Sequence, residues 1–396
     1  METTDRRIRP PGRIRLLWLI DSLAVGGAER LIPIFARHVD HERFDLVVAC
    51  LKAVDGNPIA ADLDEVDVPV TVLGARNLRD LAAFRRLLHL IRRERIDLIH
   101  THLTYADIWG RLAGWLTRRP VCSTLHVMAY DQFQSPHPGH PSALIERVAA
   151  FTRKRFGNMV IAVSEATRRA HVLRGMPAGR ITVLHNGIDL SSFDLSPDFS
   201  RAAQRAGLGL QTHVPVVITV AVLRKGKGHD TLLAAVPRIL QQMPETRFLI
   251  VGGGPLEQRL RTQVKEAGLN DAVIFTGMRR DIPELLAVAD VFVSPSQCDP
   301  LPTVVLEAMA MRLPVVAFDS GGVPEMVVDN HTGWLVRSNQ PAALAQPILE
   351  LLTHPEEARR MGEHGRLRLE AQFGAAGWVR QLESLYHRET GSRVSR

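Results

Sequence analysis

The sequence contains the stretch Ser294-Pro-Ser-Gln-Cys-Asp-Pro-Leu-Pro-Thr-Val-Val-Leu-Glu-Ala-Met309, which follows an apolar run typical of a short buried strand. Pro300 and Pro302 exclude helix until Thr303, a favourable N-cap, begins one. The first turn of such a helix offers free N–H groups and the positive end of a dipole, which together hold anions such as pyrophosphate. We expect Asp299 at the lip of this site and Glu307 one turn inside it. The alternative is an ordinary strand–turn–helix unit with its acids in solvent.

The chain has 396 residues, enough for two domains that each bury a core. Its three cysteines lie far apart without metal-type spacing, which favours a reducing compartment and no disulfide framework. A net charge of +7 is compatible with nucleic acid, an anionic membrane or phosphorylated substrates as partners. Zinc spacing, aromatic–basic interleaving and a recognition-helix pattern are absent, so no nucleic-acid partner is expected.

No stretch of the sequence is both apolar and long enough to span a membrane, but two helical stretches are suited to contact with one. The run 16–23 is too short to cross a bilayer and does not resemble a signal peptide, so we expect a cytoplasmic protein. The helical stretches 78–93 and 142–156 are amphipathic and rich in arginine, which favours peripheral contact with the anionic inner face of a membrane. A charged solvent face is the alternative for both.

Apolar runs alternate with helical stretches along the whole chain, which is typical of doubly wound parallel sheets that bind ligands beyond the carboxyl ends of their strands. A polar segment rich in proline and serine separates two such halves. The predicted organisation is a flexible basic N-terminus (1–12), a first Rossmann-like domain (13–190), a linker (191–205), a second Rossmann-like domain (206–373) and a C-terminal helix that crosses back to the first domain (374–396).

Loops at several strand ends carry residues suited to phosphate. Gly26 and Gly27 follow the first strand, Arg224 and Lys227 follow the first strand of the second half, and Gly254 lies in another glycine turn. Glycine lets backbone approach a phosphate closely, and the cations neutralise it. The dinucleotide fingerprint and the Walker spacing are both absent, so a nicotinamide cofactor and a P-loop are unsupported. Turns without a ligand are the alternative.

Three histidines, His100, His102 and His126, end predicted strands. A histidine at such a position is often only a hydrogen-bonding partner. His126 is the best placed for a function because its strand is short and apolar and a loop follows. That loop, 130–141, is rich in proline and typical of a functional lid.

Local motifs extend these observations to nearly the whole chain, from Arg13 to about Phe373. They are Gly26-Gly-Ala-Glu-Arg30, Val163-Ser164, His185-Asn-Gly-Ile-Asp189, Lys227-Gly-His-Asp230, Val251-Gly-Gly-Gly-Pro255 and Leu301-Pro-Thr-Val-Val-Leu-Glu-Ala-Met309. With them the chain resembles retaining glycosyltransferases of the family called glycosyl transferases group 1, or family four. The resemblance implies the α/β GT-B fold, two doubly wound parallel-sheet domains that face each other across a cleft.

The resemblance also implies an enzyme, a metal-independent retaining hexosyltransferase without a cofactor. Its donor would be a UDP- or GDP-sugar, and its acceptor a glycan or a polyprenyl-linked molecule in cell-surface polysaccharide synthesis. The catalytic residues implied are Asp299, His126 and Lys227, and the donor-binding residues are Gly26, Gly27, Arg224, Lys227, Gly254, Leu301, Pro302, Thr303 and Glu307.

Each role is implied by position within a motif. Lys227 would neutralise the pyrophosphate, and the N–H groups from Leu301 to Thr303 would cap the phosphates. Glu307 would hold the ribose, Asp299 the hydroxyls of the transferred sugar, and His126 would contact that sugar near the reacting centre. The glycines of the first domain would let its loop close on the diphosphate.

The chain departs from the family's pattern at three positions. Asp299 stands where glutamate is expected, Pro300 where glycine is usual, and Val222 where an arginine is expected, with Arg224 and Lys225 as possible substitutes. These departures leave two alternatives open. One is a catalytically impaired, nucleotide-sugar-binding partner of another transferase, and the other is a sugar-nucleotide epimerase on the same fold.

Overall fold

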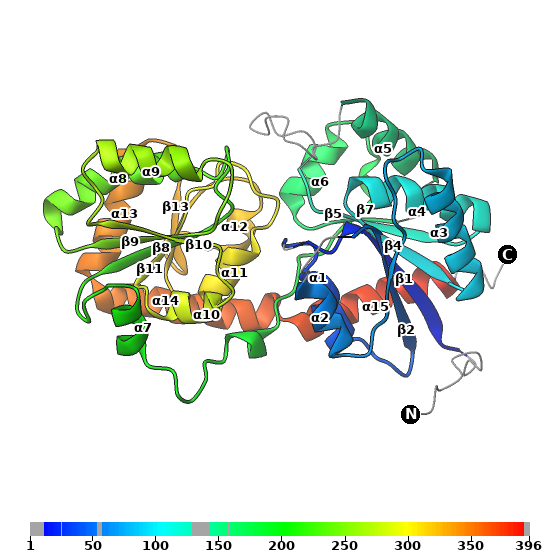
Figure 1. Ribbon diagram of the computed structural model, residues 1–396, viewed down its shortest axis with the longest axis horizontal. Helices are drawn as coiled ribbons and strands as arrows, with labels where there is room; N and C mark the ends of the chain where they lie inside the picture. The colour runs from blue at the N-terminus through cyan, green and yellow to red at the C-terminus, as the bar shows by residue number, and fades with distance from the viewer. Residues whose placement is uncertain (1–11, 25, 54–57, 129–142, 157–158, 392–396) are drawn as a thin grey trace.

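The computed structural model describes residues 12–24, 26–53, 58–128, 143–156 and 159–391. The predicted flexible N-terminus (1–12) therefore lies almost wholly outside the described residues, and the predicted lid (130–141) lies entirely outside them. Within the described ranges the chain forms two domains, each built on a parallel sheet with helices on both faces (Figure 1). The predicted α/β architecture of two Rossmann-like domains is confirmed.

The first sheet has seven strands among the described residues, all parallel. Their order in space is β3 (Val70–Val72), β2 (Phe44–Lys52), β1 (Ile14–Ser22), β4 (Leu98–His102), β5 (Val121–Leu125), β6 (Met159–Ala162) and β7 (Ile181–Val183). Its helices are α1 (Leu31–His38), α2 (Pro58–Asp64), α3 (Leu81–Arg93), α4 (Thr104–Thr117), α5 (Ala143–Phe156), α6 (Glu165–Val172) and η1 (Ala178–Arg180). The sequence analysis did not anticipate α2, which is short and lies beside residues outside the description.

The second sheet has six described strands, also parallel. Their order is β10 (Val273–Gly277), β9 (Arg247–Val251), β8 (Val216–Val220), β11 (Val291–Ser294), β12 (Val315–Phe318) and β13 (Gly333–Val336). Its helices are α8 (His229–Gln242), α9 (Glu257–Glu266), α10 (Ile282–Ala287), α11 (Thr303–Ala310), α12 (Val323–Met326), α13 (Pro341–Thr353) and α14 (Pro355–Gln372). In both sheets the strand order reverses beside the first strand, which is where ligands bind in doubly wound folds.

The segment expected as a linker is partly helical. It contains η2 (Leu190–Phe193) and the start of α7 (Arg201–Gly207). Arg205 of α7 is buried, and its guanidinium donates to the carbonyls of Thr212, Val214 and Val288. These bonds fix α7 to the second domain.

The last helix, α15 (Ala375–Gly391), packs on the first domain. Trp378 and Tyr386 of α15 lie in one buried cluster with Trp18 of β1 and Phe35 of α1. The ring centroids of Trp18 and Phe35 are 4.6 Å apart, and those of Phe35 and Tyr386 are 6.1 Å apart. Figure 1 shows this helix, in red, crossing beneath the first sheet.

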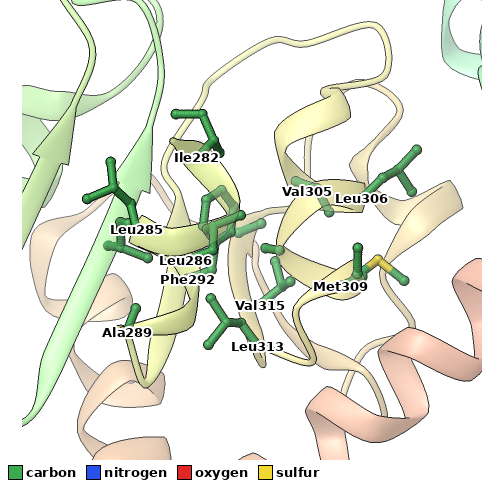
Figure 2. Packing of buried hydrophobic residues seen from close by; sticks show 14 of the residues in the cluster. Ile282, Leu285, Leu286, Ala289, Phe292, Val305, Leu306, Met309, Leu313 and Val315 are labelled. Carbon is green, nitrogen blue, oxygen red and sulfur yellow. The ribbon is translucent and has the colours of Figure 1, made fainter. Parts of the chain in front are cut away.

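A dense core holds α11 in place (Figure 2). Val305, Leu306 and Met309 of α11 are fully buried in one cluster with Phe292 of β11 and Val315 of β12. Burying side chains of this size contributes about 1.5–3 kcal/mol each. The first turn of α11 is therefore anchored before any ligand arrives.

No helix in the described part of the chain has the length and apolar character needed to cross a membrane.

Tyr386→Phe tests how α15 is held. The hydroxyl of Tyr386 lies 2.6 Å from Nδ1 of His100, and both residues are fully buried. Removing the hydroxyl leaves a buried ring nitrogen without its partner, so the free energy of unfolding should fall by about 1–3 kcal/mol. Urea unfolding followed by tryptophan fluorescence measures this, because Trp18 and Trp378 lie in the same core.

Ser384→Ala on the same helix is the control. Its hydroxyl donates to the carbonyl of Arg380 on the exposed face. We expect a change within about 0.5 kcal/mol. Equal losses in the two variants would contradict the importance assigned to the His100–Tyr386 contact.

Candidate functional site

Residues of the two domains meet at the loops that follow their strands. Arg30 Nη1 of the first domain lies 3.5 Å from Oε1 of Glu307 in α11. A Cβ added to Gly27 would lie 3.7 Å from the hydroxyl of Thr303, so the glycine loop of the first domain lies against the start of α11. Met128 Sδ is 3.5 Å from Cys298 Sγ. These three contacts bring the strand-end loops of the two domains together, and we call the region around them the cleft, after the cleft that the resemblance implies.

Lys227 and Asp299 form an ion pair in the second-domain wall of this cleft. Nζ of Lys227 donates to both carboxylate oxygens of Asp299, at 2.8 and 2.7 Å. The sequence analysis expected Asp299 at the lip of the site. The residue is only 7% exposed, so it lies inside the wall instead. Its carbonyl accepts from the N–H of Gly322 at 2.9 Å. Gly321 has φ +56°, and a side chain there would collide with that carbonyl, so the turn requires glycine.

The start of α11 differs from the expectation in two details. The N-cap is Pro302, and no side chain caps the helix, so the predicted capping role of Thr303 is wrong. Thr303 is instead the first helical residue, and its side chain hydrogen-bonds Glu307. Proline has no N–H, so Pro302 cannot donate to a phosphate. The donors available at this turn are the N–H groups of its neighbours, Leu301 and Thr303.

Glu307 is a buried acid that faces the first domain. Only 4% of the residue is exposed, and burial raises the pKa of its carboxyl, while Arg30 and the Thr303 hydroxyl oppose that rise. Arg30 itself is half-exposed. The pair therefore places a buried carboxylate next to a half-exposed cation.

The two glycine-containing loops after β8 and β9 support each other. Leu223 donates its N–H to the carbonyl of Gly253 at 3.0 Å and accepts from Leu256 at 2.9 Å. A Cβ at Gly254 would come within 2.6 Å of the Leu223 carbonyl, so this approach needs glycine. Arg224 is half-buried in the same loop, and no carboxylate of the described residues pairs with it. Val222 is 53% exposed, and it stands at the position where the resemblance implies an arginine.

The three histidines predicted at strand ends form one stack beside Trp18. His102 Nδ1 lies 2.9 Å from His126 Nε2, and the rings of His100 and His102 are 4.2 Å apart. Burial lowers the pKa of His126 to about 4 and that of His100 to about 3. The stack is therefore neutral at pH 7, and His126 is its half-buried member, while His100 and His102 are buried.

The sequence analysis did not anticipate a further contact between the domains, at Glu325. The carboxylate of Glu325 in α12 accepts from the N–H groups of Glu165 and Ala166, at 2.8 and 3.0 Å, in the first turn of α6. His185 Nε2 lies 2.8 Å from the same carboxylate. Burial would raise the pKa of Glu325, but His185 and the two N–H groups outweigh it and lower the pKa.

The structure thus brings together most of the predicted residues. Lys227 contacts Asp299, Gly27 lies against Thr303, and Glu307 contacts both Arg30 and the side chain of Thr303. Met128, two residues after His126, contacts Cys298 beside Asp299. Gly26 lies against the buried carboxylate of Glu29, where a side chain would collide. Arg30 and Glu325 were not singled out as site residues, because their partners lie far away in the sequence.

Comparisons with known proteins show the family of the chain. A family model described as Glycosyltransferase Family 4 matches residues 25–192, and one described as Glycosyl transferases group 1 matches residues 200–368. Alpha-maltose-1-phosphate synthase of Mycolicibacterium smegmatis is 32% identical over 319 residues, 74% of this chain and 80% of that protein.

Two further proteins are similar. The GDP-mannose-dependent alpha-(1-6)-phosphatidylinositol monomannoside mannosyltransferase of Mycolicibacterium smegmatis is 35% identical over 232 residues, 55% of this chain and 60% of that protein's length. The crystal structure of Anabaena HepE in complex with UDP-glucose superposes with a TM-score of 0.82 at 26% identity, covering 95% of this chain and all of that one.

His126→Asn tests the neutral histidine stack through pH. A histidine whose pKa is lowered on folding takes up its proton more readily in the unfolded chain, so its contribution to stability is lost as pH falls from about 6.5 toward 4. Over this window the wild-type protein should lose up to about 1.4 kcal/mol per pH unit relative to the variant. Urea unfolding at several pH values measures the difference. Curves that stay parallel below pH 6 would contradict it.

Proposed function

The chain belongs to the glycosyl transferases group 1 family and is a glycosyltransferase that uses nucleotide sugars, and on that premise we propose that it moves a hexose with retention from a UDP- or GDP-sugar to a lipid-linked or glycan acceptor. The observation that carries the proposal is the Lys227–Asp299 pair beside the anchored start of α11. The transfer serves the synthesis of a cell-surface polysaccharide and needs neither a metal ion nor a cofactor.

Donor binding uses the second-domain wall of the cleft. In our proposal Lys227 and Arg224 contact the pyrophosphate, together with the N–H groups of Leu301 and Thr303. Glu307 accepts hydrogen bonds from the ribose hydroxyls, and its burial beside Arg30 suits a role in a closed site. The glycine turns at Gly26, Gly27 and Gly254 let backbone approach the donor without side-chain collision.

Binding the donor requires Lys227 and Asp299 to exchange partners. Lys227 leaves the carboxylate for the pyrophosphate, and Asp299 turns to the hydroxyls of the sugar. Because the ion pair is nearly buried, each charge needs a new partner when it leaves the old one. A molecule that carries both an anionic and a hydroxyl-rich end meets this requirement, whereas inorganic phosphate meets half of it.

The reaction then exchanges one bond at the anomeric carbon for another and moves one proton. The bond between the sugar's anomeric carbon and the phosphate oxygen breaks, and a bond from the acceptor oxygen forms on the same face. The proton of the acceptor hydroxyl passes to the departing phosphate oxygen. Lys227, Arg224 and the dipole of α11 stabilise the negative charge that develops on the diphosphate. The neutral ring of His126 contacts the sugar near the reacting carbon.

The acceptor binds on the first-domain side. The mannosyltransferase relative is named for a phosphatidylinositol-based acceptor, and in our proposal this chain likewise works at the anionic cytoplasmic face of a membrane. The basic character of the chain favours that location.

A catalytically impaired partner of another transferase is the second candidate. Asp299 and Val222 favour it, since each replaces a residue expected of an active enzyme. Both candidates bind nucleotide, so binding does not separate them. Turnover does.

A donor screen by nucleotide release tests the proposal. Purified protein is incubated with UDP- and GDP-sugars, with and without polyprenyl-phosphate-linked and soluble glycan acceptors. We expect release of UDP or GDP from one donor, stimulated by one acceptor and unchanged by EDTA. No release from any donor supports the impaired partner, and loss of activity in EDTA contradicts metal independence.

Asp299→Ala gives the sharpest test of a single residue. The change removes the group that holds the sugar but frees Lys227 for the pyrophosphate, so transfer should fall by about 10²–10³ while affinity for the free nucleotide is kept or rises. Turnover assays and calorimetric titration with UDP or GDP measure the two effects.

Asp271→Ala, on the exposed surface of the second domain, is the matched control and should change neither quantity. Full transfer by Asp299→Ala would show that Asp299 does not hold the sugar.

A further inference from the structure

Helix α5 is arranged with its apolar residues toward solvent. Leu144, Val148 and Phe151 are 66, 39 and 64% exposed, and their spacing of four and three residues puts them on one stripe. On the opposite face Ala149 and Arg153 are buried. A surface helix of a globular protein normally shows the reverse arrangement. Figure 1 shows α5 on the outer surface of the first domain.

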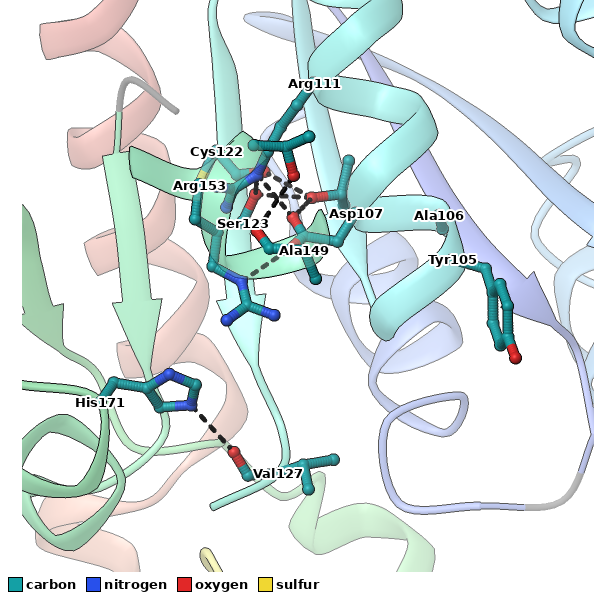
Figure 3. A network of polar contacts seen from close by, with 12 residues as sticks. Tyr105, Ala106, Asp107, Arg111, Cys122, Ser123, Val127, Ala149, Arg153 and His171 are labelled. Carbon is teal, nitrogen blue, oxygen red and sulfur yellow. Dashed lines mark hydrogen bonds and ion pairs between the residues drawn. The ribbon is translucent and has the colours of Figure 1, made fainter. Parts of the chain in front are cut away.

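A buried network fixes this orientation (Figure 3). Arg153 donates from Nε to Asp107 of α4 at 3.0 Å, and Arg111 donates to the other carboxylate oxygen at 2.8 Å. Asp107 is 4% exposed, so turning α5 over would strand a buried charge. The apolar stripe is therefore a fixed feature of the surface.

The stripe continues onto the last turn of α4. Trp115 and Leu116 are 58 and 49% exposed. The ring centroid of Trp115 lies 5.4 Å from that of Phe156, which is in turn 6.4 Å from Phe151. Exposed aromatic residues thus form one continuous patch across the two helices, which we call the α4–α5 surface.

The charges around this surface identify its partner. Arg147, Lys154 and Arg155 of α5 are exposed, whereas its one acid, Glu146, is half-buried. Lysine is depleted in protein interfaces, but aromatic residues flanked by lysine and arginine are typical of helices that lie in the interface of an anionic bilayer. This combination matches a lipid surface better than a protein.

We propose that the α4–α5 surface inserts into an anionic membrane, with Trp115, Leu144 and Phe151 among the acyl chains and the flanking cations on lipid phosphates. The inference rests on the proposed function in one respect: a lipid-linked acceptor explains why the enzyme binds a membrane. Helix α5 is the next described element after β5, the strand that His126 follows.

The sequence favoured the basic helix at 78–93 equally, and the structure separates the two. On α3 the exposed large apolar residue is Leu81, while Arg86 donates to the carbonyls of Leu73 and Gly74. The exposed Arg85 and Arg92 have no apolar stripe beside them. Helix α3 presents a charged face to solvent and is not part of the inserting surface.

Trp115 reports directly on insertion. It is the exposed tryptophan of the five in the chain, the other four being buried or half-buried. With full-length protein and vesicles of phosphatidylcholine and phosphatidylglycerol, its emission should shift to shorter wavelength and be quenched by lipids brominated on the acyl chain. Trp115→Phe should still bind the vesicles but lose the shift. Binding without quenching would overturn the proposal.

Two sets of variants separate the apolar and charged parts. Leu144→Ser with Phe151→Ser should weaken vesicle binding roughly tenfold or more and remove the part that persists at high salt. Arg147→Gln with Lys154→Gln should remove the salt-sensitive part. Leu367→Ser, which changes an exposed leucine of α14 in the second domain, is the control and should leave binding unchanged.

The outcomes for the surface and for the enzyme are distinguishable. If the serine variants bind vesicles as the wild type does, the surface assignment is wrong whatever the enzyme's activity. If they lose vesicle binding but release nucleotide normally with a soluble acceptor, the surface is confirmed independently of catalysis. If sedimentation shows a dimer that shields Trp115, the surface is an interface between copies of the chain, and the membrane assignment fails.

Discussion

The carboxylate of Glu325 ties the two domains together through three hydrogen bonds. It accepts hydrogen bonds from the first turn of α6 and lies beside His185, so one side chain of the second domain holds two loops of the first. A charge at a helix N-terminus contributes about 0.3–2 kcal/mol, and here a charged hydrogen bond adds to it. The contacts of Gly27 with Thr303 and of Arg30 with Glu307 lie in the same interface. Together these contacts hold the strand-end loops of the two domains against each other.

Within the cleft the charges neutralise one another in the absence of a ligand. Lys227 is paired with Asp299, and Arg30 lies near Glu307. Leaving a buried charge unpaired would be costly, and here the groups serve as each other's partners. Affinity for a ligand is then the difference between two sets of charged contacts. Gly321 and Gly322 let the turn after β12 lie close against the backbone of Asp299 and Pro300.

Much of the fold could be predicted from the sequence, because alternating apolar runs and helical stretches specify parallel sheets locally. Strand β11 lies at the apolar run that precedes the quoted stretch, and α11 begins at Thr303, where the two prolines first allow a helix. The site was harder. Thr303 looked like an N-cap by residue type, yet the preceding proline took that position. The pairing of Lys227 with Asp299 and of Arg30 with Glu307 joins residues 72 and 277 positions apart, which no local pattern encodes. The reversed face of α5 also depends on Asp107, which lies on another helix.

The position of α15 has a consequence for how the chain matures on the ribosome. Trp378 and Tyr386, near the C-terminus, complete the core that begins with Trp18 in the first strand. Domains generally fold in the order in which they are synthesised. Here the second domain is synthesised before α15. The apolar side chains of β1 and α1 that pack against α15 are still uncovered at that stage. Until α15 packs on the first domain, the apolar rings of Trp18 and Phe35 lack the cover that Trp378 and Tyr386 provide.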